Sequence, residues 1–269
     1  MIRRTTDRVV NIWLSALCLP FTSRLKSKLR LTQFFLVAIV HQKPNQCEPE
    51  FGYNLVMREL LLTCLFVATS FAETGKFGSF TDSNDVGAPP LKGSAEFAAS
   101  TGQYKITGSG SDIWGKADQF HYIWREMSGN FSVTATAKFL TEGVAHRKAV
   151  LMLRKSLDTD SPFVHLAIHA DGTPAIQFRN TKADNTNTVD FPMEGPGIWN
   201  LKLVRQGTSI TVWIAKDGAP LRELGHTINQ LGSPILLGLG VSSHTKEATN
   251  TVLFFDVSVE QLPTPAAKP

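Results

Sequence analysis

The sequence predicts an all-β fold, an antiparallel sandwich or barrel, because segments with strand periodicity follow one another through most of the chain. The clearest segment is Phe131–Phe139, in which every odd-numbered residue is apolar and every even-numbered residue is not. Gly, Pro, Asn and Asp separate the segments, and helical periodicity never extends past about two turns. Similar strand segments lie at residues 103–107, 121–125, 149–154, 163–169, 175–179, 199–205, 210–216, 235–241 and 251–260.

The N-terminal quarter of the chain is not expected to be part of this fold. Residues 57–72 have the three parts of a secretory signal peptide: the basic Arg58, the apolar segment Leu60–Val67, and the small residues Ser70 and Ala72. The mature protein is therefore expected to begin near residue 73 and to be secreted or periplasmic.

The chain divides into five expected parts. Residues 1–56 are either a disordered extension or the result of a wrongly assigned upstream start codon. Residues 57–72 are the signal peptide. Residues 73–93, rich in Gly and Pro, form a flexible lead. A single domain occupies residues 94–262, and residues 263–269 form a disordered tail.

Charge and cysteine usage narrow the function classes. The chain has 27 Lys and Arg against 23 Asp and Glu, but residues 1–72 hold 9 of the basic and 4 of the acidic side chains. The remainder is close to neutral, which argues against a nucleic-acid partner. All three cysteines precede residue 73, so the domain has no disulfide and no thiol site. The apolar segments are shorter than the roughly 20 residues of a membrane span, and the oligomeric state is not specified.

One hairpin has a predictable register. If Ala170–Gly172 is a three-residue loop, Leu166 faces Ile176 on an apolar surface. His165 then faces Gln177 on the opposite surface, where alternation also places Arg179. The polar stripe predicted on this outer face consists of His165, Gln177, Arg179 and, if its strand is a neighbour, Arg154.

Three stretches, residues 108–122, 128–137 and 148–156, resemble bacterial secreted domains of the concanavalin A-like lectin/glucanase superfamily, close to those labelled DUF1349. The resemblance runs through most of residues 94–261. It implies a single-domain jelly-roll sandwich with a concave sheet, a surface that relatives use for glycans. Fold similarity does not itself establish function.

Two groups of side chains are candidates for ligand binding. In the first, Trp114 would offer its ring face to a sugar while Asp112 and Asp118 accept hydroxyl hydrogen bonds. The alternative is that Trp114 closes the end of the sandwich and the two aspartates cap turns. The second candidate is the polar stripe, whose alternative is a solvated sheet face without a ligand.

Catalysis and metal binding have weaker support. Retaining glucanases of the superfamily carry the pattern Glu-x-Asp-x-x-Glu, which does not occur in residues 73–269. His165 and His169, four residues apart on one strand, would lie about 13 Å apart, too far to share a metal ion. The segment Asp184–Asp190 clusters oxygen donors that could suit calcium, although its turn composition favours a polar hairpin loop.

The sequence therefore predicts a secreted module that binds a carbohydrate or a similar polyhydroxylated ligand and catalyses no reaction. No cofactor and no metal ligand is expected, and calcium stays an open alternative. The alternatives are a structural or protein-interaction domain of the cell envelope and a glycoside hydrolase.

Overall fold

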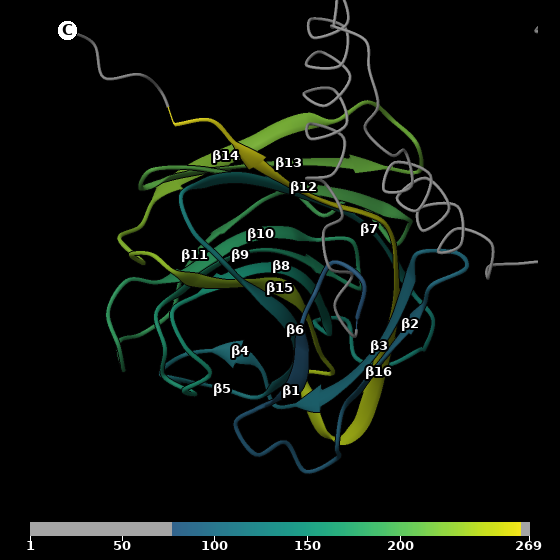
Figure 1. Cartoon of the computed structure of the whole chain (residues 1–269). Helices are drawn as coiled ribbons and strands as arrows, with labels where there is room; N and C mark the ends of the chain where they lie inside the picture. The colour runs from purple at the N-terminus through teal and green to yellow at the C-terminus, as the bar shows by residue number, and fades with distance from the viewer. Residues whose placement is uncertain (1–76, 265–269) are drawn as a thin grey trace, which may run out of the picture. The chain divides into compact units, whose positions relative to one another are not determined.

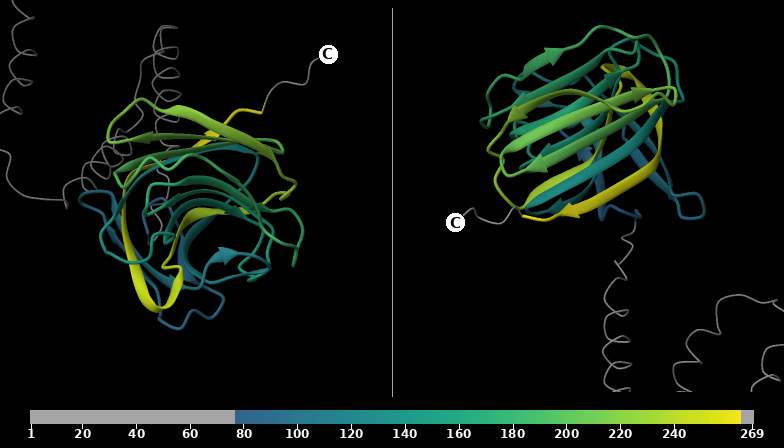
Figure 2. Two further views of the ribbon diagram at one scale, coloured as in Figure 1. Left: turned by 180° about the vertical axis from the view of Figure 1, so that it is seen from behind. Right: turned by 90° about the horizontal axis from the view of Figure 1, so that it is seen from above.

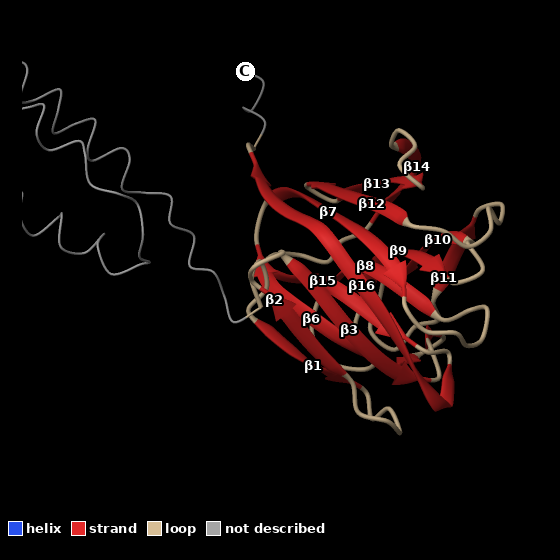
Figure 3. Ribbon diagram, turned by 90° about the vertical axis from the view of Figure 1, so that its right-hand side faces the viewer, coloured by secondary structure: helices blue, strands red, loops and turns tan. Residues whose placement is uncertain are grey.

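The structure is a computed structural model that describes residues 77–264, and within that range every regular element is a β-strand (Figure 3). The first sheet has the order β1 (Asp82–Val86), β6 (Phe120–Met127), β15 (Ile235–Ser242), β8 (Lys148–Arg154), β9 (Phe163–His169), β10 (Pro174–Arg179) and β11 (Asn187–Asp190). The second has the order β14 (Arg222–Ile228), β13 (Ser209–Lys216), β12 (Trp199–Gln206), β7 (Asn130–Phe139), β16 (Thr245–Leu262), β3 (Gln103–Gly110) and β2 (Ser94–Ala98). A small hairpin joins β4 (Ile113–Trp114) to β5 (Ala117–Asp118).

The two large sheets pack face to face, and all of their strand pairs are antiparallel. Figure 1 shows β14, β13, β12 and β7 above β10, β9, β8 and β15, with the β4–β5 hairpin on the far side of the first sheet. The view from above in Figure 2 shows the strands of the second sheet running side by side across the molecule. The predicted all-β antiparallel sandwich is confirmed.

Alternating side chains fill the space between the sheets, as the sequence predicted. In β7 the inward residues Phe131, Val133, Ala135 and Ala137 are all fully buried in the main core. The residues between them carry hydroxyl groups and face outward. Apolar side chains from the facing strands complete this core, and its burial stabilises a domain that has no disulfides.

The predicted hairpin register is confirmed. Leu166 pairs with Ile176 in the main core, and His165 pairs with Gln177 on the other face of the same sheet. Gly172 closes the turn with a φ of 87°, a conformation that glycine adopts without strain. The missing side chain also matters for packing, because a Cβ at Gly172 would lie 1.9 Å from the backbone oxygen of Gly195.

The lead before residue 94 is more ordered than predicted. Strand β1 lies at Asp82–Val86 and pairs with β6 at the edge of the first sheet, while Phe80 and Val86 are buried. A flexible lead is therefore wrong for residues 77–93, since this segment closes one margin of the sandwich. The predicted signal peptide, the extension before it and residues 265–269 of the predicted tail lie outside the described residues. No membrane-spanning helix is found within residues 77–264.

Candidate functional site

The candidate site lies on the face of the first sheet that points away from the second sheet. Residues that pair directly in an antiparallel ladder share a face, so β8, β9 and β10 bring their polar side chains together here. One half of the face is apolar and packs beneath the β4–β5 hairpin, where Ile113 contacts a second core. The other half is polar and consists of Lys148, His165, His169, Gln177 and, from β11, Thr188.

Asp118, Arg154 and Arg179, three of the predicted binding residues, form a fully buried ionic cluster. Their side chains are each 0% exposed. Arg179 Nη2 lies 2.8 Å from Asp118 Oδ1, and Arg154 Nη1 lies 3.2 Å from Asp118 Oδ2. No ligand can reach these charges while the hairpin is in place. Their prediction as ligand-contacting groups is thus corrected: alternation placed Arg154 and Arg179 on the right face, but the hairpin, which carries Asp118, covers them.

The two guanidinium groups also fix the surrounding loops. Arg179 donates to the backbone oxygens of Gly115, Ser161 and Asp184. Arg154 donates to the backbone oxygens of Ser156 and Asp158. The cluster therefore connects the sheet to the hairpin and to two neighbouring loops, and so positions Trp114 at the hairpin tip.

Burial shapes the protonation of the cluster. Desolvation raises the pKa of Asp118, and the hydrogen bonds and positive charges of Arg179 and Arg154 act against this rise. Burial likewise lowers the pKa of Arg154, with the Asp118 carboxylate opposing the change. Each charge is tolerated because its partners replace the lost water.

A second polar network lies beside the ionic cluster. Lys148 Nζ lies 2.6 Å from Asp112 Oδ1 and donates to Gln177 Oε1 at 3.1 Å. His165 Nε2 lies 2.9 Å from the same Gln177 oxygen. An amide oxygen only accepts, so His165 donates from Nε2 and its Nδ1 carries no proton. This buried Nδ1 has no hydrogen-bond partner.

Trp114 is the accessible part of the site. Along β4, Ile113 points into the second core, and alternation turns the next side chain outward. Trp114 is 41% exposed, and the Lys148 ammonium lies 5.7 Å from its ring centroid. Asp112, in contact with Lys148, is partly exposed. Trp114 and Asp112 thus remain available to a ligand, with Lys148, Gln177 and His165 behind them.

Three histidines border this accessible part. The ring of His146 lies 5.3 Å from that of His169 and 5.6 Å from that of His244, and His244 Nδ1 lies 3.2 Å from Asp112 Oδ2. Sequence reasoning missed His146, His244 and Lys148. Of these three residues, only Lys148 could have been predicted from the sequence, because alternation along β8 places it on the same face as Arg154.

Metal binding finds no support here. Among residues 77–264, no group of three or more His, Cys, Asp or Glu side chains has an arrangement that could hold a metal ion. In the segment considered for calcium, Asp184 accepts from the backbone of Asn185, and Asp190 accepts from Thr188. These carboxylates take part in local hydrogen bonds of a polar loop and strand.

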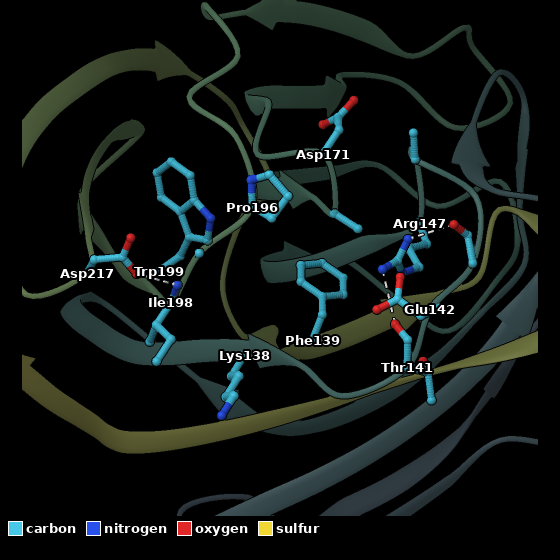
Figure 4. A pocket seen from close by; sticks show the side chains of 14 residues that line it. Lys138, Phe139, Thr141, Glu142, Arg147, Asp171, Pro196, Ile198, Trp199 and Asp217 are labelled. Carbon is cyan, nitrogen blue, oxygen red and sulfur yellow. Dashed lines mark hydrogen bonds between the residues drawn. The ribbon is translucent and has the colours of Figure 1, made fainter.

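A separate hollow of about 570 Å³ opens at one end of the sandwich (Figure 4). Phe139 and Trp199 supply its apolar surface, with Lys138 and Glu142 nearby. Arg147, also in its wall, donates to three backbone oxygens of its own loop. None of the predicted binding residues lines this hollow.

Comparison with known proteins supports the fold alone. No protein family matches the chain, and no curated protein is recognisably similar in sequence. A functionally unknown protein from Saccharomyces cerevisiae aligns with a TM-score of 0.51 and 16% identity, over 63% of this chain and 93% of its own.

Two further structures align at lower scores. Carbohydrate-binding module CBM66 from Bacillus subtilis gives a TM-score of 0.46 at 14% identity, over 68% of this chain and 97% of its own. Peanut lectin gives 0.43 at 9% identity, over 68% and 98% of the two chains. The resemblance to DUF1349 domains stays a prediction.

Proposed function

We propose that this protein is a non-catalytic module that binds a carbohydrate or a similar polyhydroxylated ligand at Trp114. The observation that carries the proposal is an exposed indole ring held beside a fixed ion pair, Lys148 with Asp112, on a face that is otherwise closely packed. A sugar ring can stack its C–H surface on Trp114. Its hydroxyl groups can then bind the partly exposed carboxylate of Asp112, which the buried Lys148 ammonium holds in place.

The chemistry of the site supports binding without hydrolysis. A two-carboxylate mechanism needs one group to attack or activate water and another to protonate the leaving group. The hairpin has two carboxylates, but Asp118 is fully buried between two guanidinium groups. Of these two carboxylates, only Asp112 can contact the ligand, and it does so as a hydrogen-bond acceptor.

Glycan-array screening of the full chain, followed by calorimetry with the best ligand, tests this function. Trp114→Ala is expected to weaken binding by at least about tenfold, as for an aromatic residue central to an interface. Trp213→Ala is a matched control, because Trp213 also lies under a lysine, with Lys202 Nζ 5.4 Å from its ring, but on the other sheet. Equal affinity of wild type and Trp114→Ala would contradict the proposal.

A protein-interaction role is the second candidate, and the sheet edges favour it. All four residues of the edge strand β11 are exposed, including Val189. On the edge strand β14, Ile228 is exposed as well. Exposed edge strands offer unpaired backbone groups to another chain. An empty glycan array together with a co-purifying protein would favour this role.

We also propose that the protein is secreted or periplasmic, on the strength of the signal-like residues 57–72. Cleavage after Ala72 would leave a chain that begins near Glu73. Mass spectrometry of protein recovered from its native cells is expected to find this N-terminus. A native chain that still contains residues 57–72 would contradict cleavage.

A further inference from the structure

Ser83, His121 and Asp85 form a hydrogen-bonded array at the margin of the first sheet. Ser83 Oγ lies 2.8 Å from His121 Nε2, and His121 Nδ1 lies 2.7 Å from Asp85 Oδ1. The serine and the carboxylate thus contact opposite nitrogens of one imidazole ring. In this order of contacts, an imidazole can take the proton of a serine hydroxyl while a carboxylate orients the ring.

Strand pairing builds the array. Asp85 pairs with His121, and Ser83 pairs with Ile123, so both β1 side chains share a face with His121. β1 is an edge strand, so within residues 77–264 no strand pairs with its outer side. His121 is buried, whereas Ser83 is partly exposed. The base is therefore shielded while the hydroxyl remains reachable from solvent.

Gly93 fixes the orientation of the carboxylate and the ring. Its N–H donates to Asp85 Oδ1 at 3.1 Å and to Oδ2 at 3.2 Å. A Cβ at Gly93 would lie 2.4 Å from His121 Nδ1 and 2.6 Å from Asp85 Oδ1, so only glycine fits. A carboxylate only accepts, so a neutral His121 carries its proton on Nδ1. Nε2 is then free to accept from Ser83.

We propose that Ser83 is an activated nucleophile and a site of covalent acylation by activated esters. Ser83 Oγ would attack the ester carbonyl carbon while its proton passes to His121 Nε2. The bond from that carbon to the leaving oxygen then breaks, and Nε2 returns the proton to the departing group. The products are an acylated Ser83, a neutral His121 and a free alcohol or phenol.

The backbone around the array limits the range of electrophiles. The N–H of Ser83 donates to Asp82 Oδ1, and the N–H of Asp85 donates to Asn84 Oδ1. These two donors are therefore engaged and do not stabilise an oxyanion. Each such donor is worth roughly 10²–10³ in rate in hydrolases. The array thus suits aryl esters and fluorophosphonates, which have good leaving groups, better than amides.

Labelling of the folded full chain with a fluorophosphonate probe tests the proposal. Intact-mass measurement is expected to show a single adduct, and peptide mapping to place it on Ser83. Ser83→Ala removes the nucleophile, so no adduct is expected at this position, and any labelling that remains should be at least about 100-fold slower because other hydroxyl groups lack a positioned base. Ser111→Ala is the matched control and should label like wild type, because Ser111 is exposed and donates to Gln119 at 3.0 Å rather than to an imidazole.

A thiol variant tests the base without disturbing the core. In Ser83→Cys, His121 is expected to favour the thiolate, so iodoacetamide should alkylate this residue at least tenfold faster at pH 6.5 than the cysteine of Ser111→Cys. Peptide mapping separates both from Cys18, Cys47 and Cys64. Equal alkylation rates, an adduct on another residue, or equal probe labelling of wild type and Ser83→Ala would overturn the proposal.

Discussion

Asp118→Asn is expected to lower the free energy of unfolding by about 3–5 kcal/mol, the range for removing one partner from a buried ion pair. The substitution keeps the shape of the side chain but leaves Arg154 and Arg179 as buried charges without a counter-charge. The cost arises because the two guanidinium groups have lost their hydration and no longer receive compensation. Urea unfolding followed by fluorescence measures the change.

Two further variants separate charge from general disruption. Asp158→Asn removes a carboxylate paired with Lys182, but both side chains are more than half exposed, so stability should hardly change. Replacing the whole cluster, with Asp118→Leu, Arg154→Met and Arg179→Met together, should recover only the part of the loss that comes from unpaired charge, because the backbone oxygens that accept from the two arginines also lose their donors. A near-neutral Asp118→Asn would contradict the assigned role of the cluster.

The same substitution should also affect the proposed binding site. Asp118 ends the hairpin that carries Trp114, and its N–H donates to the backbone oxygen of Thr159. Once the ionic cluster is weakened, the hairpin should open more often, with faster amide exchange at residues 112–118. Ligand affinity should then fall although no ligand-contacting residue has changed.

The period of two predicted most of the sandwich because most of its strands bury one face. It failed for β11 and β14, which lie at sheet edges and alternate little in burial. It also failed for β4 and β5, which have only two residues each. Strand β1, with the polar sequence Asp82–Val86, offers one apolar side chain, so pairing with β6 rather than its own composition orders it.

The candidate site was predictable in position but not in exposure. Alternation places His165, Gln177 and Arg179 on one face, and the structure places them there. What covers a face depends on contacts distant in sequence: Asp118 lies 36 residues from Arg154 and 61 from Arg179. No local pattern contains that information. The array of Ser83 and His121 escaped notice for the same reason, since it joins two strands 38 residues apart.

Acidification is expected to destabilise the protein through its buried histidines. Burial, reinforced by the Lys148 ammonium, lowers the pKa of His165 well below its usual range, and the same causes lower the pKa of His169. In the unfolded chain, both imidazoles take up a proton near pH 6.5, whereas the folded protein keeps them neutral. The unfolded state therefore binds more protons, and stability falls as the pH drops below that value.

The size of this effect follows from proton linkage. Each histidine that stays neutral lowers the free energy of unfolding by about 1.4 kcal/mol per pH unit between its unfolded and folded pKa values. His165, whose pKa lies well below its usual range, should thus make the larger contribution to this loss below pH 6.5. His169 should add a smaller loss over a narrower range, because its shift is smaller.

Urea unfolding of wild type and His165→Gln at several pH values tests this linkage. The variant has no imidazole at this position, so below pH 6.5 its stability should depend on pH less steeply, with about 1.4 kcal/mol per pH unit as the limit for one proton. His226→Gln is the matched control, since His226 is exposed on the edge strand β14 and should keep the wild-type slope. Parallel curves for wild type and His165→Gln would show that the buried imidazole takes up its proton without cost. His165 would then have access to water or to an acceptor for Nδ1, and the hairpin would cover this face less completely than its contacts imply.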